Sequence, residues 1–345
     1  MAEVEVRKRN RATLWVIALG GLVTLALGVL IVSYAYLNYR YHSDQTFNDK
    51  TSFEVPRGAS LRRIAKKAEA ENLITSARVF ELVTRMRGLE HNFKAGEFSV
   101  HANVTMATLT DDLLNTAMVR QYPFTAPEGL TSAQIVRALD AVEAYVDDDP
   151  AVPPEGSLLP ETYSFPRGTK HSEVLARMSA AQAALLDEYW PNRDPNIPVK
   201  TRAEAIILAS VVEKETGIGM ERGKVAGVFT NRLRRGMRLQ SDPTIIYGIS
   251  RGEILRGRDG KQRRIFRSEI DRRTDWNTYQ IDGLPRTPIC NPGRDAILAV
   301  LNPEETDALF FVADGTGGHT FSRTLAEHER AVAKWRRIQR ERGLR

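Results

Sequence analysis

The chain has 345 residues, of which 42% are hydrophobic and 27% charged. This composition supports two or three modest domains with packed cores and excludes a disordered chain. The single cysteine, Cys290, excludes an intramolecular disulfide framework and a cysteine-based zinc cluster, since both need several thiolates. The 49 Lys and Arg exceed the 43 Asp and Glu by six, so the net charge is +6. This net charge is too small for a dedicated nucleic-acid-binding protein, but it is compatible with a polyanionic or membrane-surface partner.

Near the N-terminus, residues 14–37 form an uncharged apolar segment of 24 residues. A helix of this length crosses a hydrocarbon core of about 30 Å. Four basic residues precede the segment and only Arg40 follows closely, which predicts a cytoplasmic tail over residues 1–13 and export of the remainder. The alternative is a cleaved signal peptide, because Ser33 and Ala35 form a small-x-small pair; the long apolar run favours a retained transmembrane helix.

The rest of the chain divides into a polar stretch and two candidate domains. Residues 38–50 are polar and non-periodic, which predicts a short linker. Residues 51–118 combine a strand-like alternation at Phe53 and Val55 with stretches of helical spacing, which predicts a small α/β unit. This unit contains no paired nucleophile and base, so we expect it to act as a binding or spacing module. A boundary near position 120 follows, with a larger mixed α+β domain over residues 122–345.

One apolar helix ends in carboxylates. Residues 202–217 lie between a plausible N-cap and a glycine, as in a buried helix. A turn of about 100° per residue places Glu215 on the side of Leu208 and Val211, whereas Glu213 points roughly the other way. A carboxyl group on an apolar face is desolvated, which raises its pKa as a general acid requires. The alternative is that Glu215 faces solvent in a charged last turn.

This geometry limits the mechanism. Glu213 and Glu215 are about 200° apart on the helix and cannot readily flank one scissile bond, as the two carboxylates of ordinary glycosidases do. A hydrolase would need a second carboxylate, with Glu161, Glu221 and Asp242 as candidates. A reaction in which one group gives and then takes a proton would not need it.

Two further patterns bear on ligands. His319 and His328 are nine positions apart and have no third ligand at a usual spacing, so no metal site is predicted. The Arg-rich run over residues 251–273 is typical of a solvated face, with contact to acidic groups or lipid headgroups as the alternative.

Motifs along the chain follow a recognisable order. They occupy residues 94–98, 159–163, 209–217, 221–226, 228–233, 236–244, 246–248, 277–279, 283–285, 288–293, 311–315 and 318–321. In this order they resemble the YceG-like endolytic murein transglycosylases (the MltG family), and the resemblance spans nearly the whole chain. Two departures are Glu161, where the family usually has Asp, and Arg286-Thr287, which replace the commoner Pro-Gly.

The resemblance implies an enzyme anchored in the bacterial cytoplasmic (inner) membrane, with its catalytic domain on the periplasmic or outer side. Residues 51–118 would form a LysM-like domain and residues 122–345 a YceG-like catalytic domain with a lysozyme-like active-site helix. The family's catalytic residue is the second glutamate of Glu-Lys-Glu, which is Glu215 and agrees with the helical geometry. The substrate-binding residues implied by the motifs are Glu161, Gln240, Ser241, Asp242, Tyr247, Asn277 and Tyr279.

The implied reaction is cleavage within nascent peptidoglycan strands. Glu215 would protonate the oxygen that links N-acetylmuramic acid to N-acetylglucosamine and then accept the proton of the muramyl C6 hydroxyl, leaving a 1,6-anhydro end. Asn277 or Tyr279 could stabilise developing charge. No metal or organic cofactor is expected; the partners expected are glycan strands, the membrane and peptidoglycan synthases, with no nucleic acid. The alternatives are a muramidase and a non-catalytic wall-binding protein.

Overall fold

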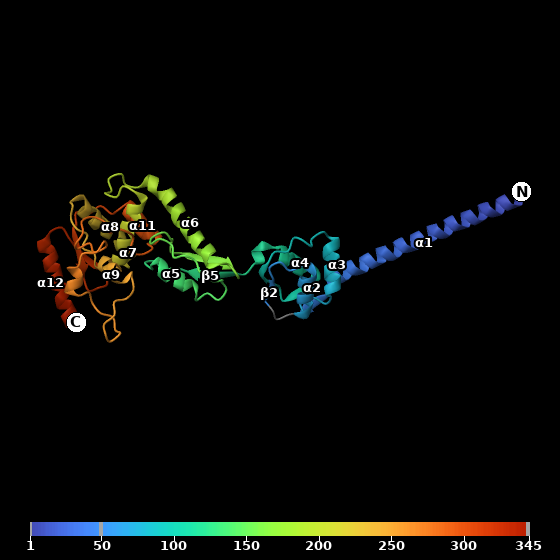
Figure 1. Cartoon of the computed structure of the whole chain (residues 1–345), viewed down its shortest axis with the longest axis horizontal. Coiled ribbons are helices and arrows are strands. Elements are labelled where there is room, and N and C mark those ends of the chain that lie inside the picture. The colour runs from blue at the N-terminus through green and yellow to red at the C-terminus, as the bar shows by residue number, and fades with distance from the viewer. Residues whose placement is uncertain (1, 48–50, 343–345) are drawn as a thin grey trace. The chain divides into compact units, whose positions relative to one another are not determined.

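The computed structural model describes residues 2–47 and 51–342 and divides them between two compact units, Met1–Tyr122 and Pro123–Arg345. The chain is a mixture of helices and short strands, which confirms the predicted α+β class, and in the described residues the strands pair two at a time (Figure 1). The division falls close to the boundary expected near position 120.

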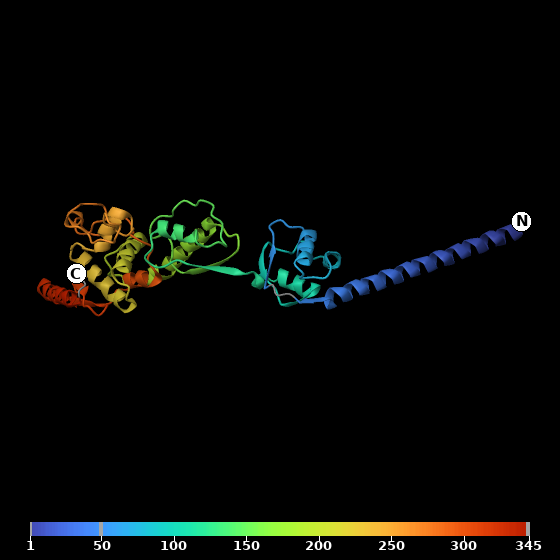
Figure 2. The same cartoon turned by 90° about the horizontal axis from the view of Figure 1, so that it is seen from below.

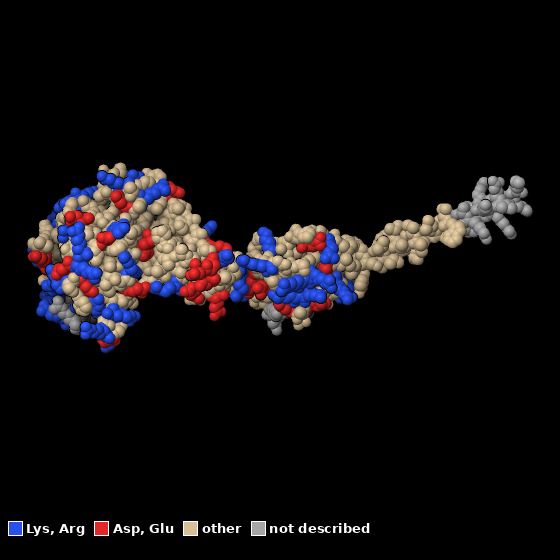
Figure 3. All heavy atoms as spheres, viewed as in Figure 1, with Lys and Arg blue, Asp and Glu red and all other residues tan. Residues whose placement is uncertain are grey.

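The first unit opens with one long helix, α1 (Ala2–Ser43). Its part from Trp15 to Ser43 has 29 residues with a mean hydropathy of 2.5, and by length and composition it can cross a membrane. The large apolar side chains of this part are exposed to solvent within the chain, as a lipid-facing helix would be. Figure 3 shows its surface without charged residues over most of the described length.

The structure corrects the linker expected over residues 38–50. Helix α1 continues through Ser43, and strand β1 (Gln45–Phe47) pairs antiparallel with β4 (Asn103–Thr105). Tyr41 is fully buried, and its hydroxyl contacts that of Thr110. The last turns of the apolar helix are therefore built into the small unit. Residues 48–50 lie outside the described part of the chain.

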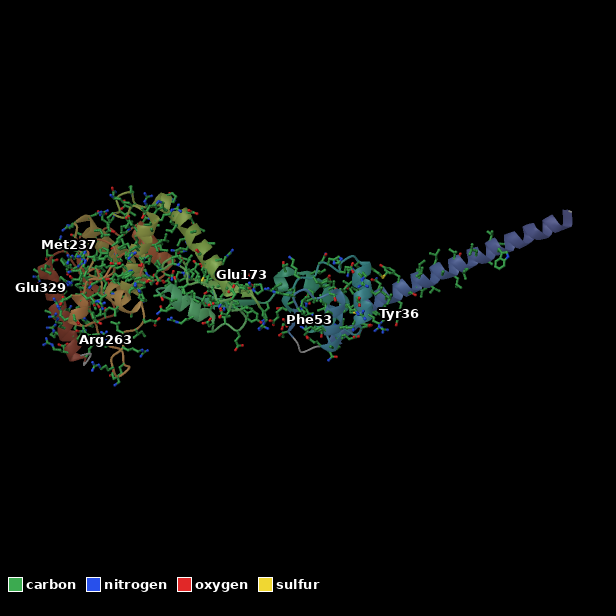
Figure 4. All side chains as sticks on the ribbon, in the orientation of Figure 1. Tyr36, Phe53, Glu173, Met237, Arg263 and Glu329 are labelled. Carbon is green, nitrogen blue, oxygen red and sulfur yellow. The ribbon has the colours of Figure 1, made fainter. Side chains whose placement is uncertain are left out.

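The core of the small unit lies between a two-stranded sheet and three helices. Phe53 of one strand faces Phe98 of the other, and both are buried (Figure 4 labels Phe53). Ser60 and Ser76 cap the first two helices by accepting backbone N–H groups, as N-cap residues do. The elements are β2 (Ser52–Val55), α2 (Leu61–Ala70), α3 (Ala77–Met86), β3 (Gly96–Ser99), α4 (Met106–Leu114) and the 3-10 turn η1 (Thr116–Met118).

The second unit is mainly helical and carries two small two-stranded sheets, of which β7–β8 is antiparallel. β5 pairs with β6, and β7 pairs with β8 in a register that sets Phe311 opposite Phe321. The elements are β5 (Gln121–Thr125), α5 (Ser132–Leu139), β6 (Thr162–Pro166), α6 (His171–Tyr189), η2 (Trp190–Asn192), α7 (Arg202–Glu215), α8 (Gly219–Arg234), α9 (Asp242–Ser250), α10 (Arg267–Ile270), α11 (Arg294–Leu301), β7 (Phe310–Ala313), β8 (His319–Ser322) and α12 (Leu325–Glu341).

Helix α7 is the centre of the second unit. Thr201 caps it in a reciprocal pair with Glu204, which satisfies two backbone N–H groups at its start. Seven of its residues between 205 and 212 are buried on all sides, and α11 and α8 pack against it (Figures 1 and 2). A helix that is apolar all round belongs in a core. The helix ends where Thr216 becomes extended, so Glu215 is the last helical residue.

Candidate active site

Glu215 lies half-buried at the end of the central helix, rather than facing solvent. Burial raises its pKa from 4.5 to about 7, and the negative charge of Asp242 adds to this rise. The hydroxyl of Ser241 and the positive charges of His319 and Arg232 act in the opposite direction. A carboxyl group with a pKa near neutrality can both donate and accept a proton at physiological pH.

Glu213, two residues earlier, has a different environment. One oxygen accepts a hydrogen bond from Arg222 at 3.2 Å, and the other accepts the backbone N–H of Gly293 at 3.0 Å. Its side chain is only 5% exposed, and burial raises its pKa as well. Because both carboxylate oxygens are engaged, Glu213 holds α7 to the start of α11. The expected divergence of the two glutamates agrees with these contacts.

The turn before α9 holds three predicted site residues, of which Ser241 and Asp242 act on Glu215. The backbone N–H groups of Gln240 and Ser241 donate to the carbonyl and the hydroxyl of Thr278, at 3.2 and 2.9 Å. Gln240 is exposed and adopts a left-handed backbone with φ of 51°, which is uncommon for a residue other than glycine. The buried Ser241 and the exposed Asp242 follow directly, so this strained turn directs both of them at Glu215.

Tyr279 completes this group from the neighbouring loop. Its hydroxyl donates to Asp242 Oδ1 at 2.8 Å, and burial raises its pKa, so the phenol stays protonated. The charges of Glu215 and Arg232 also affect its pKa, so Tyr279 lies near both of them. Ser241, Asp242 and Tyr279 therefore lie near Glu215.

Asn277 differs from its expected role. It is 1% exposed, and its side-chain nitrogen lies within hydrogen-bond distance of the carbonyls of Glu269, Ile270 and Arg272, the closest at 2.7 Å. Its oxygen accepts the N–H of Tyr279 at 3.0 Å. Both polar groups of the Asn277 side chain are therefore hydrogen-bonded to nearby backbone. Asn277 positions Tyr279, and it does not itself face the cleft or stabilise charge there.

Tyr247 and Glu161 have partners other than Glu215 among the described residues. The Tyr247 hydroxyl donates to Glu155 at 3.0 Å, and burial raises its pKa to about 12. Its ring packs edge-on against Trp276. Glu161 is exposed, and its nearest cation is Arg294 at 4.0 Å. No contact recorded within the described residues joins Glu161 to Glu215, so the structure does not bring Glu161 into the group.

A cavity of about 630 Å³ adjoins the site and shares Asp242 with it, whereas Glu215 does not line it. Its volume is in the range of small-ligand pockets. Part of its wall comes from the Arg-rich run, in which Arg263 (labelled in Figure 4) forms a bidentate ion pair with Glu269. The lining residues are Gly129, Thr131, Lys214, Asp242, Pro243, Ile246, Tyr247, Gly252, Glu253, Ile254, Leu255, Gln262, Arg263, Arg264, Ile265, Ile270 and Ile289.

Two residues of the site were not predicted from the sequence. Arg232, 7% exposed, donates to the carbonyls of Leu309 and Leu239 at 2.7 Å, and burial lowers its pKa. His319 contacts Glu221 through its ring, at 2.6 Å, and through its backbone N–H, at 3.0 Å. Glu221 is therefore engaged by His319. The sequence singled out His319 only as a candidate metal ligand with His328 and as part of the motif over residues 318–321, and neither pattern predicts its contact with Glu221.

We expect Asp242→Asn to shift the pH profile of catalysis. Removal of the negative charge lowers the pKa of Glu215, so the alkaline limb of the activity moves to lower pH. At pH 8 the rate should fall roughly two- to tenfold, with a smaller change at pH 5.5. Asparagine keeps an acceptor for Tyr279, so the hydrogen bond at that position survives. Rates measured from pH 5 to 9 test this, and an equal loss at every pH would contradict it.

The site thus has Glu215 at the end of a buried helix, with Asp242, Tyr279, Arg232 and His319 around it. The model of the YceG-like family matches residues 53–334, so the chain belongs to the YceG-like family and the predicted resemblance is confirmed.

The relatives and a solved structure cover most of the chain. The endolytic murein transglycosylase of Bacillus subtilis strain 168 is 26% identical over 317 residues, 82% of this chain and 84% of the relative. That of Streptococcus pneumoniae serotype 2 strain D39 is 26% identical over 354 residues, 88% of this chain and 63% of the relative. The crystal structure of a YceG-like protein from Listeria monocytogenes has a TM-score of 0.50 at 24% identity, covering 83% of this chain and 98% of that one, and supports the fold.

Proposed function

We propose that this chain is a membrane-anchored endolytic lytic transglycosylase that cleaves peptidoglycan between N-acetylmuramic acid and N-acetylglucosamine. The observation that carries the proposal is the half-buried Glu215, whose pKa of about 7 lets one group serve as acid and then as base. The named activity of the relatives from B. subtilis and S. pneumoniae supports the same reaction.

In the first step, protonated Glu215 donates its proton to the glycosidic oxygen. The bond from that oxygen to the muramyl C1 breaks, and an oxocarbenium-like or acetamido-stabilised species develops at C1. Burial and the charge of Asp242 hold Glu215 in its protonated form up to neutral pH, so that the proton is present for transfer. The leaving sugar departs with a new hydroxyl group.

In the second step, the Glu215 carboxylate accepts the proton of the muramyl C6 hydroxyl as O6 bonds to C1. The product carries a 1,6-anhydro ring, and Glu215 is again protonated, so no water is consumed. Attack within one sugar gains from proximity. Arg232 and His319, which lower the pKa of Glu215, favour the carboxylate that forms between the two steps.

A muramidase is the second candidate, because Asp242 carries a second carboxyl group beside Glu215. Such a hydrolase would use water at C1. The other candidate carboxylates support it less: Glu221 is engaged by His319, and Glu161 has no recorded contact with Glu215 in the described residues. A non-catalytic wall-binding protein would have no use for a carboxyl group with a near-neutral pKa.

The digestion products separate these functions. We expect the full chain in detergent to convert uncrosslinked glycan strands into fragments with 1,6-anhydro ends, which mass spectrometry distinguishes from reducing ends by one water. Digestion with a known muramidase supplies the reducing-end control. Fragments with reducing ends would establish the hydrolase, and intact strands that remain bound to the chain would establish a binding protein.

The remaining features extend the proposal. The apolar part of α1 would anchor the chain once in the cytoplasmic membrane, with residues 1–13 in the cytoplasm and the site on the outer side. Residues 51–118 would act as a LysM-like module ahead of the catalytic domain, and peptidoglycan synthases would be partners, because new strands emerge from them at the membrane. Protease protection of the tail in sealed vesicles tests the orientation.

A further inference from the structure

A second group of chemically active side chains lies outside the active site. Asp140 caps the end of α5, Asp147 lies in the following loop, and His171 is the first residue of α6. One imidazole nitrogen and one carboxylate oxygen from each Asp lie within 4.8 Å of one another. Figure 3 shows acidic side chains gathered on this part of the second unit.

The imidazole of His171 points between the two carboxylates without a bond to either. Its Nδ1 lies 3.8 Å from Asp140 Oδ1 and 3.5 Å from Asp147 Oδ1, and within the described residues it has no hydrogen-bond partner. The side chain is only 2% exposed. Buried polar atoms nearly always have a hydrogen-bond partner or a ligand. The described protein groups supply no such partner for His171 Nδ1, so we expect a bound ligand there.

The spacing of the three atoms fits a shared metal ion. Two ligands that each lie about 2.0–2.2 Å from one ion are separated by about 3–4.4 Å, and both measured separations fall in this range. The side chains of Asp140 and Asp147 are 58% and 65% exposed, which leaves room for water as a further ligand. Charged oxygens and a neutral imidazole form a donor set that divalent transition metals prefer.

The backbone holds these ligands close to one another. The N–H of His171 donates to the carbonyl of Val146 at 3.0 Å, and the N–H of Val146 donates to Thr169 at 2.9 Å, which joins the loop to the start of α6. Asp147 Oδ1 also accepts the N–H of Asp149 at 2.8 Å, which orients its carboxylate. A site whose ligands are already positioned loses little conformational freedom on binding.

We propose that Asp140, Asp147 and His171 bind one divalent cation of the zinc class, with water completing its coordination. The imidazole nitrogen favours Zn²⁺ over Ca²⁺ and Mg²⁺, which prefer all-oxygen sites. The ion ties the end of α5 to the start of α6, and its role is structural. The sequence alone predicted no metal, because these residues are far apart in the chain and form no spacing motif.

The test is a calorimetric titration of the full chain in detergent with ZnCl₂ at pH 7, after treatment with a chelator. We expect one Zn²⁺ per chain and a rise in Tm of roughly 5–10 °C at a hundredfold excess over Kd. Asp140→Asn combined with Asp147→Asn should weaken binding at least ~100-fold. Both residues are exposed, so the double variant should fold.

Glu143→Gln is the matched control, because Glu143 is an exposed acid of the same loop that is not part of the cluster; its affinity should stay within threefold of the parent. X-ray absorption should show a nitrogen ligand at about 2.0–2.1 Å. No saturable binding, or equal affinity in the double variant, would overturn the site. Ca²⁺ binding as tight as that of Zn²⁺ would overturn the zinc class. Glycan cleavage is a separate readout, so failure here leaves the proposed function standing.

Discussion

Glu215→Gln should reduce glycan cleavage by about 10³- to 10⁴-fold. Glutamine has nearly the same shape as glutamate but can neither donate a proton to the glycosidic oxygen nor accept one from the C6 hydroxyl, so both steps lose their acid–base catalyst. Other groups around the site remain, including Asp242 and Tyr279, and they supply the residual rate. The measurement is the rate of release of anhydro-ended fragments from glycan strands, followed by chromatography and mass spectrometry.

Glu213→Gln is the matched control on the same helix. Its oxygens contact Arg222 and the backbone of Gly293, so this variant should lose some stability but keep its activity within about tenfold. Retained binding to sacculi would show that the Glu215 variant is folded. Full activity in the Glu215 variant together with loss of activity in the Glu213 variant would reverse the assignment of the acid.

Glu215 was predictable because the evidence for it is local. Helical rotation at a fixed angle per residue relates it to Leu208 and Val211, and all three lie on one short segment whose start is capped by Thr201. The order of the motifs then placed Ser241, Asp242 and Tyr279 in the same site, although the sequence did not reveal that the backbone of Ser241 is held by Thr278.

The contributions of Arg232, His319 and Asn277 depend on contacts between distant parts of the chain. His319 reaches the site through the β7–β8 hairpin. Arg232 is fixed by the carbonyls of Leu239 and Leu309, the second of which is 77 positions away in the chain. From the sequence, an asparagine in a loop suggests a ligand contact. In the structure, the side chain of Asn277 instead donates hydrogen bonds to buried backbone carbonyls. The sequence likewise suggests that Tyr41 belongs to a polar linker, whereas in the structure tertiary packing buries the whole side chain.

The burial that makes Glu215 an acid also lowers the stability of the fold at alkaline pH. Its pKa is about 7 in the folded chain and 4.5 as a model value. A group whose pKa is raised on folding stabilises the protein fully below pH 4.5, and this contribution is lost as the pH rises through 7. The difference of pKa amounts to about 3 kcal/mol in the free energy of unfolding.

Glu215→Gln should therefore gain stability over the parent as the pH rises. The difference in the free energy of unfolding between the variant and the parent should shift in favour of the variant by about 3 kcal/mol from pH 4 to pH 9, because glutamine never ionises. Urea unfolding of both full chains, followed by tryptophan fluorescence, measures this difference; Trp190, Trp276 and Trp335 report on the second unit. If the difference in the free energy of unfolding between variant and parent did not change from pH 4 to pH 9, ionisation of Glu215 would not destabilise the folded chain. That result would remove the physical basis for its role as an acid at neutral pH.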